Sequence, residues 1–528
     1  MTAFFFTDCI VEEENELTTS SSSSSSITAT SIASGSTFSA NNALYIDLDN
    51  EKVSVDNTDW ASLSDTETSL FSETVTVTKA SATSLIKIDA QEITENLAIY
   101  FTGTQTSGGV KIQTSTDHEV GVYLDNISIT STNYPCIDIT KGGAATVFLT
   151  GENTLKDGRN YSSDYSSSGS DNKGTLFCKG GISLCGDGSL TITQNYKSCI
   201  ASKGNISIEN GTYTLTSTAV AVYDSSESDY NSPALINCDG NITIKGGSVS
   251  GTASGKGSKA ITVDGTYTQS DGMVNVKATG SKISSGSASA SAKGVKVDGA
   301  INVSGGKLYA SSASHEAIES KSTITITGGE VYGYSAADDG INAASDFTIS
   351  GGYVCGYALN NDGLDANGNL YIKGGVVYAV GSTTPEKSID ANTEGGYKLY
   401  ISGGVVMALG PLENGSSLTQ SCYSASSWSA NTIYGLTVGS TTYTFKTPSS
   451  TKGYGSGIVV SGNSTPTLTS GATAGSATYF DGLVSVGGTA GNTSVSLSSY
   501  SSGSSTTTGG GTTPPNNGGQ QGGGFGRP

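Results

Sequence analysis

The chain has 528 residues, of which 14% are charged, and its formal net charge is −20. This acidic balance, without a basic patch, argues against DNA or RNA as a partner. No apolar run is long enough to span a membrane, and the apolar patch at 3–6 is too short for a signal-peptide core. Two interpretations of residues 1–10 stay open: a trimmed secretion or lipoprotein signal with Cys9, and an irregular start of the sequence.

Apolar and polar residues alternate with a period of two along most of the chain. The runs include VTVTKA at 75–80, LIKID at 85–89, ISIEN at 206–210, ITIKGG at 242–247 and ITITGG at 324–329. Such alternation is typical of strands, and amphipathic helical periodicity is almost absent. The sequence therefore predicts an all-β protein.

Three segments differ from this pattern in composition. Residues 1–40 are acidic and then serine-rich, which predicts a flexible leader. Residues 157–173 form one long polar stretch, for which we expect a loop. Residues 491–528 are rich in Gly, Ser, Thr and Pro, and this composition predicts a disordered tail.

Glycines that close GG, DG or NG turns recur at a regular interval. They are Gly188, Gly211, Gly247, Gly272, Gly306, Gly329, Gly352, Gly375 and Gly404. The base interval is 23 residues, and the longer intervals contain loop insertions. An apolar residue lies 11 positions before eight of these glycines, and Ile389 takes this place in the last unit. These apolar residues are Phe177, Ile200, Ile236, Ile261, Val295, Ile318, Ile341 and Leu364.

Each unit therefore holds three short strands, one at the apolar residue, one before the turn glycine and one after it. Three strands in about 23 residues form one coil of a parallel β-helix, a solenoid whose coils stack about 4.8 Å apart. We expect this solenoid over residues 41–410. Residues two and four positions after each turn glycine, such as Val331 and Gly333, are predicted to point inward, and Tyr332 between them to point outward.

The later units carry acidic or amide residues two positions before and one position after the apolar residue. They are Glu316, Glu319, Asp339, Asn342, Asp362, Asp365 and Asp390. Stacked carboxylates repel one another, so we expect bound Ca²⁺, which accepts carboxylate and amide oxygens in tolerant geometry. The best core is Asp339, Asn342, Asp362 and Asp365. The alternative is a row of solvated turn residues, with Lys387 paired to Asp362.

Tyrosines and lysines form two further candidate groups. Tyr309, Tyr332 and Tyr378 align on outward positions, with Tyr334 and Tyr357 two positions further on. Aromatic faces pack against sugar rings, although tyrosine also simply favours strands. Lys259, Lys293 and Lys296 precede the acidic residues and are candidates for binding sugar carboxylates. Their alternative role is ion pairing with Glu316 and Glu319.

The eight cysteines show neither a CxxC pair nor a framework spacing. We expect mostly buried thiols, with one disulfide bridge among Cys178, Cys185 and Cys199. With two histidines and no cysteine cluster, a zinc or redox-metal site is not expected.

Several motifs resemble one bacterial family, the carbohydrate-binding domain-containing proteins. They are LTGENTLKDG at 149–158, GDGSLTIT at 186–193, GNISIENG at 204–211, DDGIN at 338–342 and NDGLDA at 361–366. The resemblance covers roughly 41–490 and implies a right-handed parallel β-helix related in fold to pectate lyases. YTFKTPSSTKGYGSGIVVSG at 443–462 resembles the family's C-terminal capping segment, so we expect a β cap over 411–490.

The resemblance also implies an extracellular or cell-surface protein that binds acidic plant cell-wall glycans such as polygalacturonate, or cellulose, with bound calcium. The family's Asp-Gly-Ile motif is kept at Asp339–Ile341 and, with Leu, at Asp362–Leu364. It is absent at Ser198–Ile200 and Lys259–Ile261, where calcium sites are therefore not expected.

Three functions compete on this basis. The first is a non-catalytic carbohydrate-binding protein in which Ca²⁺ bridges protein and sugar carboxylates. The second is a structural surface protein or adhesin whose solenoid is only a stalk. The third is a calcium-dependent polysaccharide lyase, which needs a base; Lys387 is the one candidate among the acidic residues, because the two arginines, Arg159 and Arg527, lie in the loop and the tail.

Overall fold

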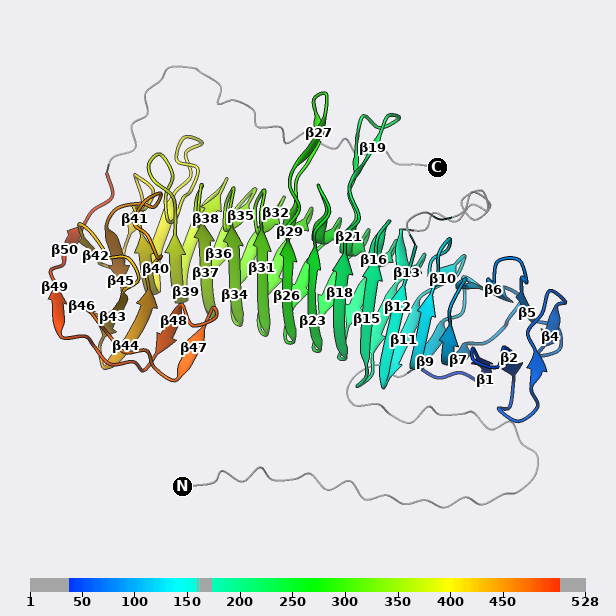
Figure 1. The fold of residues 1–528 in the computed structure, drawn as a ribbon. Helices are drawn as coiled ribbons and strands as arrows, with labels where there is room; N and C mark the ends of the chain where they lie inside the picture. Colours follow the sequence, from blue (N-terminus) through cyan, green and yellow to red (C-terminus); the bar gives the residue numbers. More distant parts are fainter. Residues whose placement is uncertain (1–37, 159–160, 162–172, 504–528) are drawn as a thin grey trace, which may run out of the picture.

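The computed structural model describes residues 38–158, 161 and 173–503, and every regular element in them is a β-strand. The prediction of an all-β protein is confirmed for this part of the chain. Figure 1 shows the strands stacked along one long axis, with β1 (Asn42–Asp47) near one end and a smaller sheet at the other. No described residues form a helix with the length and apolarity needed to cross a bilayer.

A sheet of thirteen strands runs along the stack, and its strands pair in parallel from β6 to β38. Its members in chain order are β4 (Thr68–Leu70), β5 (Val75–Lys79), β6 (Ile86–Ala90), β8 (Val110–Thr114), β10 (Ile137–Thr140), β13 (Gly174–Cys178), β16 (Ser198–Ser202), β21 (Ala234–Cys238), β24 (Lys259–Val263), β29 (Lys293–Val297), β32 (Ile318–Ser320), β35 (Ile341–Ala343) and β38 (Leu364–Ala366). Each strand follows a loop or turn that returns the chain from the larger sheet.

The larger sheet contains two parallel runs that merge in the long strands β39 (Leu370–Val380) and β40 (Leu399–Leu409). The first run is β14 (Ile182–Cys185), β17 (Ile206–Ile208), β22 (Ile242–Ile244), β25 (Tyr267–Gln269), β30 (Ile301–Val303), β33 (Ile324–Ile326) and β36 (Phe347–Ile349). The second run is β15 (Ser189–Gln194), β18 (Thr212–Ser217), β23 (Ser248–Ala253), β26 (Met273–Ala278), β31 (Lys307–Ser312), β34 (Glu330–Ser335) and β37 (Tyr353–Ala358).

The remaining strands of the larger sheet lie toward its two ends, and two hairpins project from the body. Near the N-terminus are β1, β2 (Lys52–Ser54), β3 (Ala61–Ser62), β7 (Leu97–Gln105), β9 (Val120–Thr130), β11 (Ala145–Thr150) and β12 (Glu152–Lys156). The projecting hairpins in Figure 1 are β19 (Val222–Asp224) with β20 (Asp229–Asn231) and β27 (Ile283–Ser285) with β28 (Ala288–Ala290).

The predicted alignment of the repeats agrees with the strand register. In the thirteen-stranded sheet the in-register partners are Leu176, Ile200, Ile236, Ile261, Val295, Ile318, Ile341 and Leu364, and Ile389 forms an isolated bridge to Leu364. Partners from β32 to β38 are 23 residues apart. The position of Phe177 was wrong by one residue, because Phe177 pairs with Ala201 and the connection from β13 to Gly188 is one residue longer.

One continuous apolar core fills the space between the sheets. It runs from Leu44 to Val459 and contains the residues predicted to point inward, such as Val331. The turn glycines that follow the first run adopt positive φ, for example 75° at Gly329 and 76° at Gly352. Only glycine adopts this conformation without strain, which explains why the repeat keeps it.

The C-terminal residues form a separate antiparallel sheet beside the last parallel strands (Figure 1). Its strands are β43 (Ile433–Val438), β44 (Thr441–Lys446), β46 (Thr467–Ser470), β47 (Ala477–Tyr479), β48 (Val484–Val486) and β49 (Thr493–Val495). The larger sheet ends with β41 (Ser417–Leu418), β42 (Cys422–Ala425), β45 (Ile458–Ser461) and β50 (Ser498–Tyr500).

Two predictions at the segment level need correction or lie outside the described residues. The tail predicted for 491–528 starts too early, because β49 and β50 pair with β46 and β42 within it. Backbone pairing outweighs the Ser- and Gly-rich composition there. Residues 1–37 of the predicted leader and most of the predicted loop at 157–173 lie outside the described residues.

The expected disulfide bridge is absent among the described cysteines. Cys178, Cys185 and Cys199 are free and buried, as are Cys136, Cys238, Cys355 and Cys422. Burial raises the pKa of the Cys178 and Cys185 thiols to about 12, so these side chains are neutral apolar groups of the packing at neutral pH.

Candidate functional site

The predicted acidic residues gather along one edge of the thirteen-stranded sheet. Glu319 in β32 pairs with Asn342 in β35, which pairs with Asp365 in β38, so these three positions form an in-register row. Glu316, Asp339 and Asp362 lie just before the same strands and are buried. The edge divides into two groups with different charge balance.

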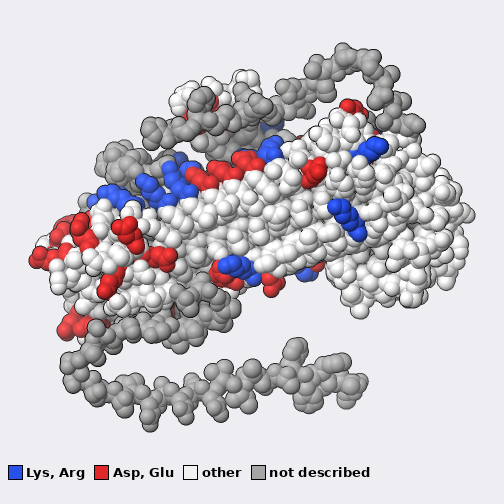
Figure 2. Space-filling model, turned by 180° about the vertical axis from the view of Figure 1, so that it is seen from behind, with Lys and Arg blue, Asp and Glu red and all other residues white. Residues whose placement is uncertain are grey.

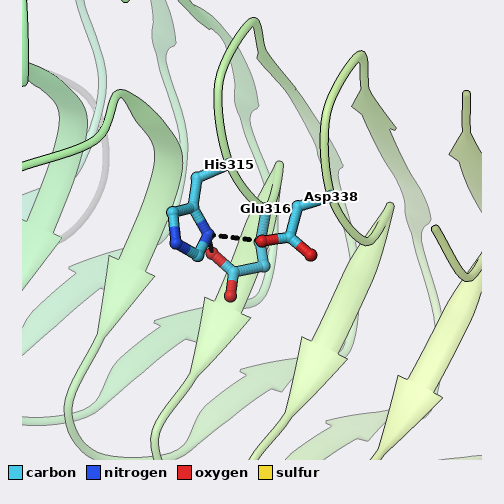
Figure 3. Close-up of side chains that lie close together, drawn as sticks. All are labelled: His315, Glu316 and Asp338. Carbon is cyan, nitrogen blue, oxygen red and sulfur yellow. Dashed lines mark ion pairs between the residues drawn. The ribbon is translucent and has the colours of Figure 1, made fainter. Parts of the chain in front are cut away.

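The first group, which we call the His315 cluster, contains Lys293, His315, Glu316, Glu319 and Asp338. His315 Nδ1 lies 2.8 Å from Asp338 Oδ2 and also contacts the Glu316 carboxylate (Figure 3). Lys293 Nζ lies 3.0 Å from Glu316 Oε2 and 2.5 Å from Glu319 Oε2. Cations therefore already neutralise these carboxylates.

This finding changes the role assigned to Glu316 and Glu319. Glu319 also pairs with Lys321, so its carboxylate has two basic partners. Burial disfavours the charged form of His315, but hydrogen bonds to Asp338 and Glu316 outweigh burial and raise its pKa to about 9. The sequence gave no reason to place His315 in this network, because its partners come from neighbouring strands. The cluster has as many basic as acidic groups and needs no metal ion.

Replacing Lys293 by Met is expected to lower the free energy of unfolding by about 3 kcal/mol at neutral pH, because buried Glu316 and Glu319 lose a partner. The matched control is Lys296→Met in the same strand. Lys296 pairs at 2.6 Å with Asp298, whose side chain is 41% exposed, so this change should cost at most about 1 kcal/mol. Chemical denaturation of both variants checks the difference, and equal losses would contradict the assignment.

The second group, which we call the Asp365 cluster, contains Asp362, Asp365 and Asp390. Each offers a carboxylate oxygen, and these oxygens lie within 4.8 Å of one another. Asn342 donates its amide hydrogens to Asp365 Oδ2 at 2.6 Å and to Asp339 Oδ2 at 3.0 Å. Asp339 therefore joins the cluster through Asn342, and the predicted core of Asp339, Asn342, Asp362 and Asp365 is brought together.

The Asp365 cluster carries more negative charge than its surroundings neutralise. Lys387 donates its backbone N–H to Asp362 Oδ1 at 2.5 Å, but its ammonium group contacts Pro385 O at 2.7 Å and Glu413 Oε2 at 3.5 Å. The alternative in which the Lys387 side chain pairs with Asp362 is therefore not what the structure shows.

The pKa values of these carboxyl groups reflect burial and mutual repulsion. Burial and the backbone N–H of Lys387 act in opposite directions on Asp362, and burial prevails, raising its pKa to about 7. Burial and the Asp362 charge raise the pKa of Asp365 to about 8. Burial raises the pKa of Asp390 to about 10, together with its hydrogen bond to Glu413. The ionised cluster is costly unless a cation joins it.

The donor set fits a calcium ion. Ca²⁺ binds six to eight oxygen atoms at 2.3–2.6 Å, so two oxygens on one ion lie at most about 5 Å apart. The oxygens of Asp362, Asp365 and Asp390 meet this limit. Asp339 and the Asn342 carbonyl oxygen are the neighbouring donors, while sulfur and imidazole ligands do not occur in this cluster.

The tyrosine column is covered by the C-terminal sheet, which corrects its predicted role. Tyr378 is fully buried and donates its hydroxyl hydrogen to Lys446 O at 2.8 Å, and Tyr357 is buried against Tyr454. Tyr332 and Tyr334 pack against the same apolar cluster. These side chains do leave the inner core as predicted, but a ring packed against protein cannot stack on a sugar.

Tyr309 and the remaining lysines have defined partners or environments as well. Tyr309 donates its hydroxyl hydrogen to Glu330, at the boundary with the C-terminal sheet. Lys296 pairs with Asp298, and burial with the nearby Lys296 and Lys293 charges lowers the pKa of Lys259 to about 8. The structure therefore favours the ion-pairing alternative for Lys293, while Lys259 stays a candidate for an anionic group.

The sequence analysis missed a second row of acidic residues. Asp239, Asp264 and Asp298 directly follow the paired strands β21, β24 and β29. Figure 2 shows rows of basic and acidic side chains along one ridge of the molecule. The available signal was an Asp-Gly pair three positions after the apolar residue. Lys173 pairs with Asp239 at 2.7 Å, so this row is partly neutralised.

The chain is similar to known proteins in two comparisons. A family model described as "Carbohydrate-binding domain-containing protein" matches residues 89–340. A solved structure from C. thermocellum, described as a polysaccharide lyase-like protein in its gadolinium derivative, has a TM-score of 0.32 and 18% sequence identity, and the match covers 64% of this chain and 93% of that chain. No curated protein matches the chain.

Proposed function

We propose that the protein binds an acidic cell-wall polysaccharide through calcium, without cleaving it, outside the cell or on a bacterial cell surface. Its architecture would be a right-handed parallel β-helix with about 23 residues per coil. The family match at 89–340 supports a carbohydrate partner. The Asp365 cluster supports the calcium, because its buried carboxylates converge with too little positive charge around them.

The single observation that carries the proposal is the contrast between the two neighbouring clusters. The His315 cluster balances its charges internally with Lys293, Lys321 and His315. One or two strands further along, Asp362, Asp365 and Asp390 converge, and the Lys387 ammonium turns to other partners. A cation at this second cluster would complete the charge balance of the edge.

Calcium at this position also explains how an acidic protein could bind an acidic polymer. The net charge of −20 repels a polyuronate at long range, but a divalent cation held by protein carboxylates still accepts oxygens from a sugar carboxylate. Asp365 and Asp390 are half-buried rather than fully enclosed, so an ion there has an open side. Lys259, with its lowered pKa, lies in β24 of the same sheet and would contact a polymer that follows the edge.

Binding without cleavage agrees with the position of the lysines. A lyase needs a free base beside the metal-bound sugar. Lys387 is the basic residue next to the Asp365 cluster, and its ammonium group is engaged by Pro385 and Glu413.

Affinity electrophoresis in polygalacturonate tests the proposal. The protein is expected to be retarded with calcium and to migrate freely with EGTA, and no unsaturated sugar ends should appear at 235 nm. The variant Asp365→Asn should lose the retardation. The control Asp264→Asn, which removes an exposed carboxylate from the other acidic row, should keep it. Absence of retardation under both conditions would favour a structural stalk, and release of unsaturated ends would favour the lyase.

A further inference from the structure

A groove of about 610 Å³ lies where the long parallel sheet meets the C-terminal sheet. Its floor consists of turn glycines that follow β33, β36 and β39's first half, among them Gly352, Gly375 and Gly404. One wall is the β43–β44 hairpin, from Val438 to Tyr443. The volume falls within the range of about 300–1,000 Å³ that is typical of ligand sites.

The glycine floor follows from the backbone and produces a smooth channel. Gly352, Gly375 and Gly404 have φ values of 76°, 81° and 81°. A Cβ atom at each would lie 2.6–2.8 Å from a backbone oxygen of the preceding level. Side chains are therefore excluded at three successive levels. With about 4.8 Å between levels, the bare floor extends over roughly 10 Å along the stack.

The walls combine apolar surface with uncharged polar groups. Tyr353 and Tyr443 line the groove beside Val376 and Val405, and one face of Tyr353 is covered by Tyr479 at a ring-centroid distance of 3.5 Å. Thr441 and the exposed Asn463 supply a hydroxyl and an amide.

None of the residues that line the groove carries a charge. An acidic sugar would find no cation there, whereas the carbon-bound hydrogens of a neutral sugar can pack on tyrosine and its hydroxyls can bond to the amide.

We propose that this groove is a second glycan site, which binds a short segment of a neutral, hydroxyl-rich polysaccharide independently of calcium. The inference rests on the proposed carbohydrate-binding function and adds a substrate class to it. The two sites would then divide the work, with the Asp365 cluster binding anionic sugar and the groove binding neutral sugar. A cell wall that contains both polymers would be contacted at two places by one molecule.

Affinity electrophoresis of the full chain in hydroxyethylcellulose and in galactomannan, both in EGTA, tests this site. At least one of these neutral polymers is expected to retard the wild-type protein. The double variant Thr441→Ala/Asn463→Ala is expected to bind at least tenfold more weakly. The control Thr467→Ala/Ser494→Ala removes the same number of polar groups from exposed positions of the same sheet outside the groove, and should bind like the wild type.

The outcomes separate this inference from the calcium-dependent function. Loss of neutral-polymer binding in the groove variant, with calcium-dependent polygalacturonate binding unchanged, supports the second site. No retardation of the wild type in either neutral polymer, or equal retardation of wild type and groove variant, overturns it. The Asp365→Asn variant should still bind the neutral polymer, and its failure to do so would also overturn the independence of the two sites.

Discussion

In EGTA, the free energy of unfolding is expected to fall as the pH rises from about 4 to about 8, and calcium is expected to reverse this loss. The folded-state pKa values of Asp362 and Asp365 are raised to about 7 and about 8. Between the unfolded value near 4 and these values, the folded state binds more protons than the unfolded state, so stability decreases with pH. Calcium replaces those protons, and at one hundred times its Kd it stabilises the folded state by about 3 kcal/mol.

Thermal denaturation at pH 5 and pH 8, with calcium and with EGTA, measures this effect. The difference between calcium and EGTA should be large at pH 8 and small at pH 5, where protons compete with the ion. His315, with its pKa raised to about 9, gives a pH slope of the same sign between about 6.5 and 9. The comparison with Asp365→Asn therefore decides, because this variant should lose the calcium effect and keep the His315 contribution. A calcium effect of equal size in the variant would contradict the proposed ligands.

Replacing Glu330 by Ala is expected to lower the free energy of unfolding by about 2–5 kcal/mol and to loosen the C-terminal sheet. Glu330 is buried, accepts a hydrogen bond from the Phe480 backbone N–H at 2.6 Å and another from the Tyr309 hydroxyl, and pairs with Lys307 at 2.9 Å. Truncation leaves the N–H of fully buried Phe480 and the Tyr309 hydroxyl without this acceptor, and unsatisfied buried donors cost about 1–3 kcal/mol each.

The conservative variant Glu330→Gln is the matched control for this prediction. Its side-chain carbonyl oxygen still accepts from Phe480, so the loss should be smaller than for Ala. Urea denaturation gives the stability of both variants, and limited proteolysis reports on the sheet itself. Faster cleavage within residues 430–500 is expected for Ala, while equal stability of Ala, Gln and wild type would contradict a fastening role for Glu330.

Much of the parallel-sheet body could be predicted because its information is local and repeated. The apolar residue 11 positions before each turn glycine marks an inward side chain in the same strand, and repetition places Ile318, Ile341 and Leu364 in register. The acidic row was predictable for the same reason, since Glu319, Asn342 and Asp365 occupy one position of the repeat. Where a connection differs in length, as after β13, the prediction slipped by one residue.

The charges around that row were not predictable from the repeat alone. Lys293 turns to Glu316 and Glu319, His315 contacts Asp338, and Lys387 turns away from Asp362 toward Glu413. These choices depend on side-chain rotamers and on burial. The sequence therefore predicted one acidic edge, and the three-dimensional arrangement divided it into a balanced cluster and an unbalanced one.

The sequence by itself determined that this protein is built of strands, where the inward residues lie and which residues form the acidic edge, because each follows from spacing along the chain. Only the tertiary structure decided what covers the outer face. The C-terminal sheet packs over Tyr357 and Tyr378 and forms the neutral groove with the turn glycines. The sheet and the tyrosines are far apart in sequence and share no repeat, so no periodicity relates them, and their contact arises only from the apolar surface that both bury.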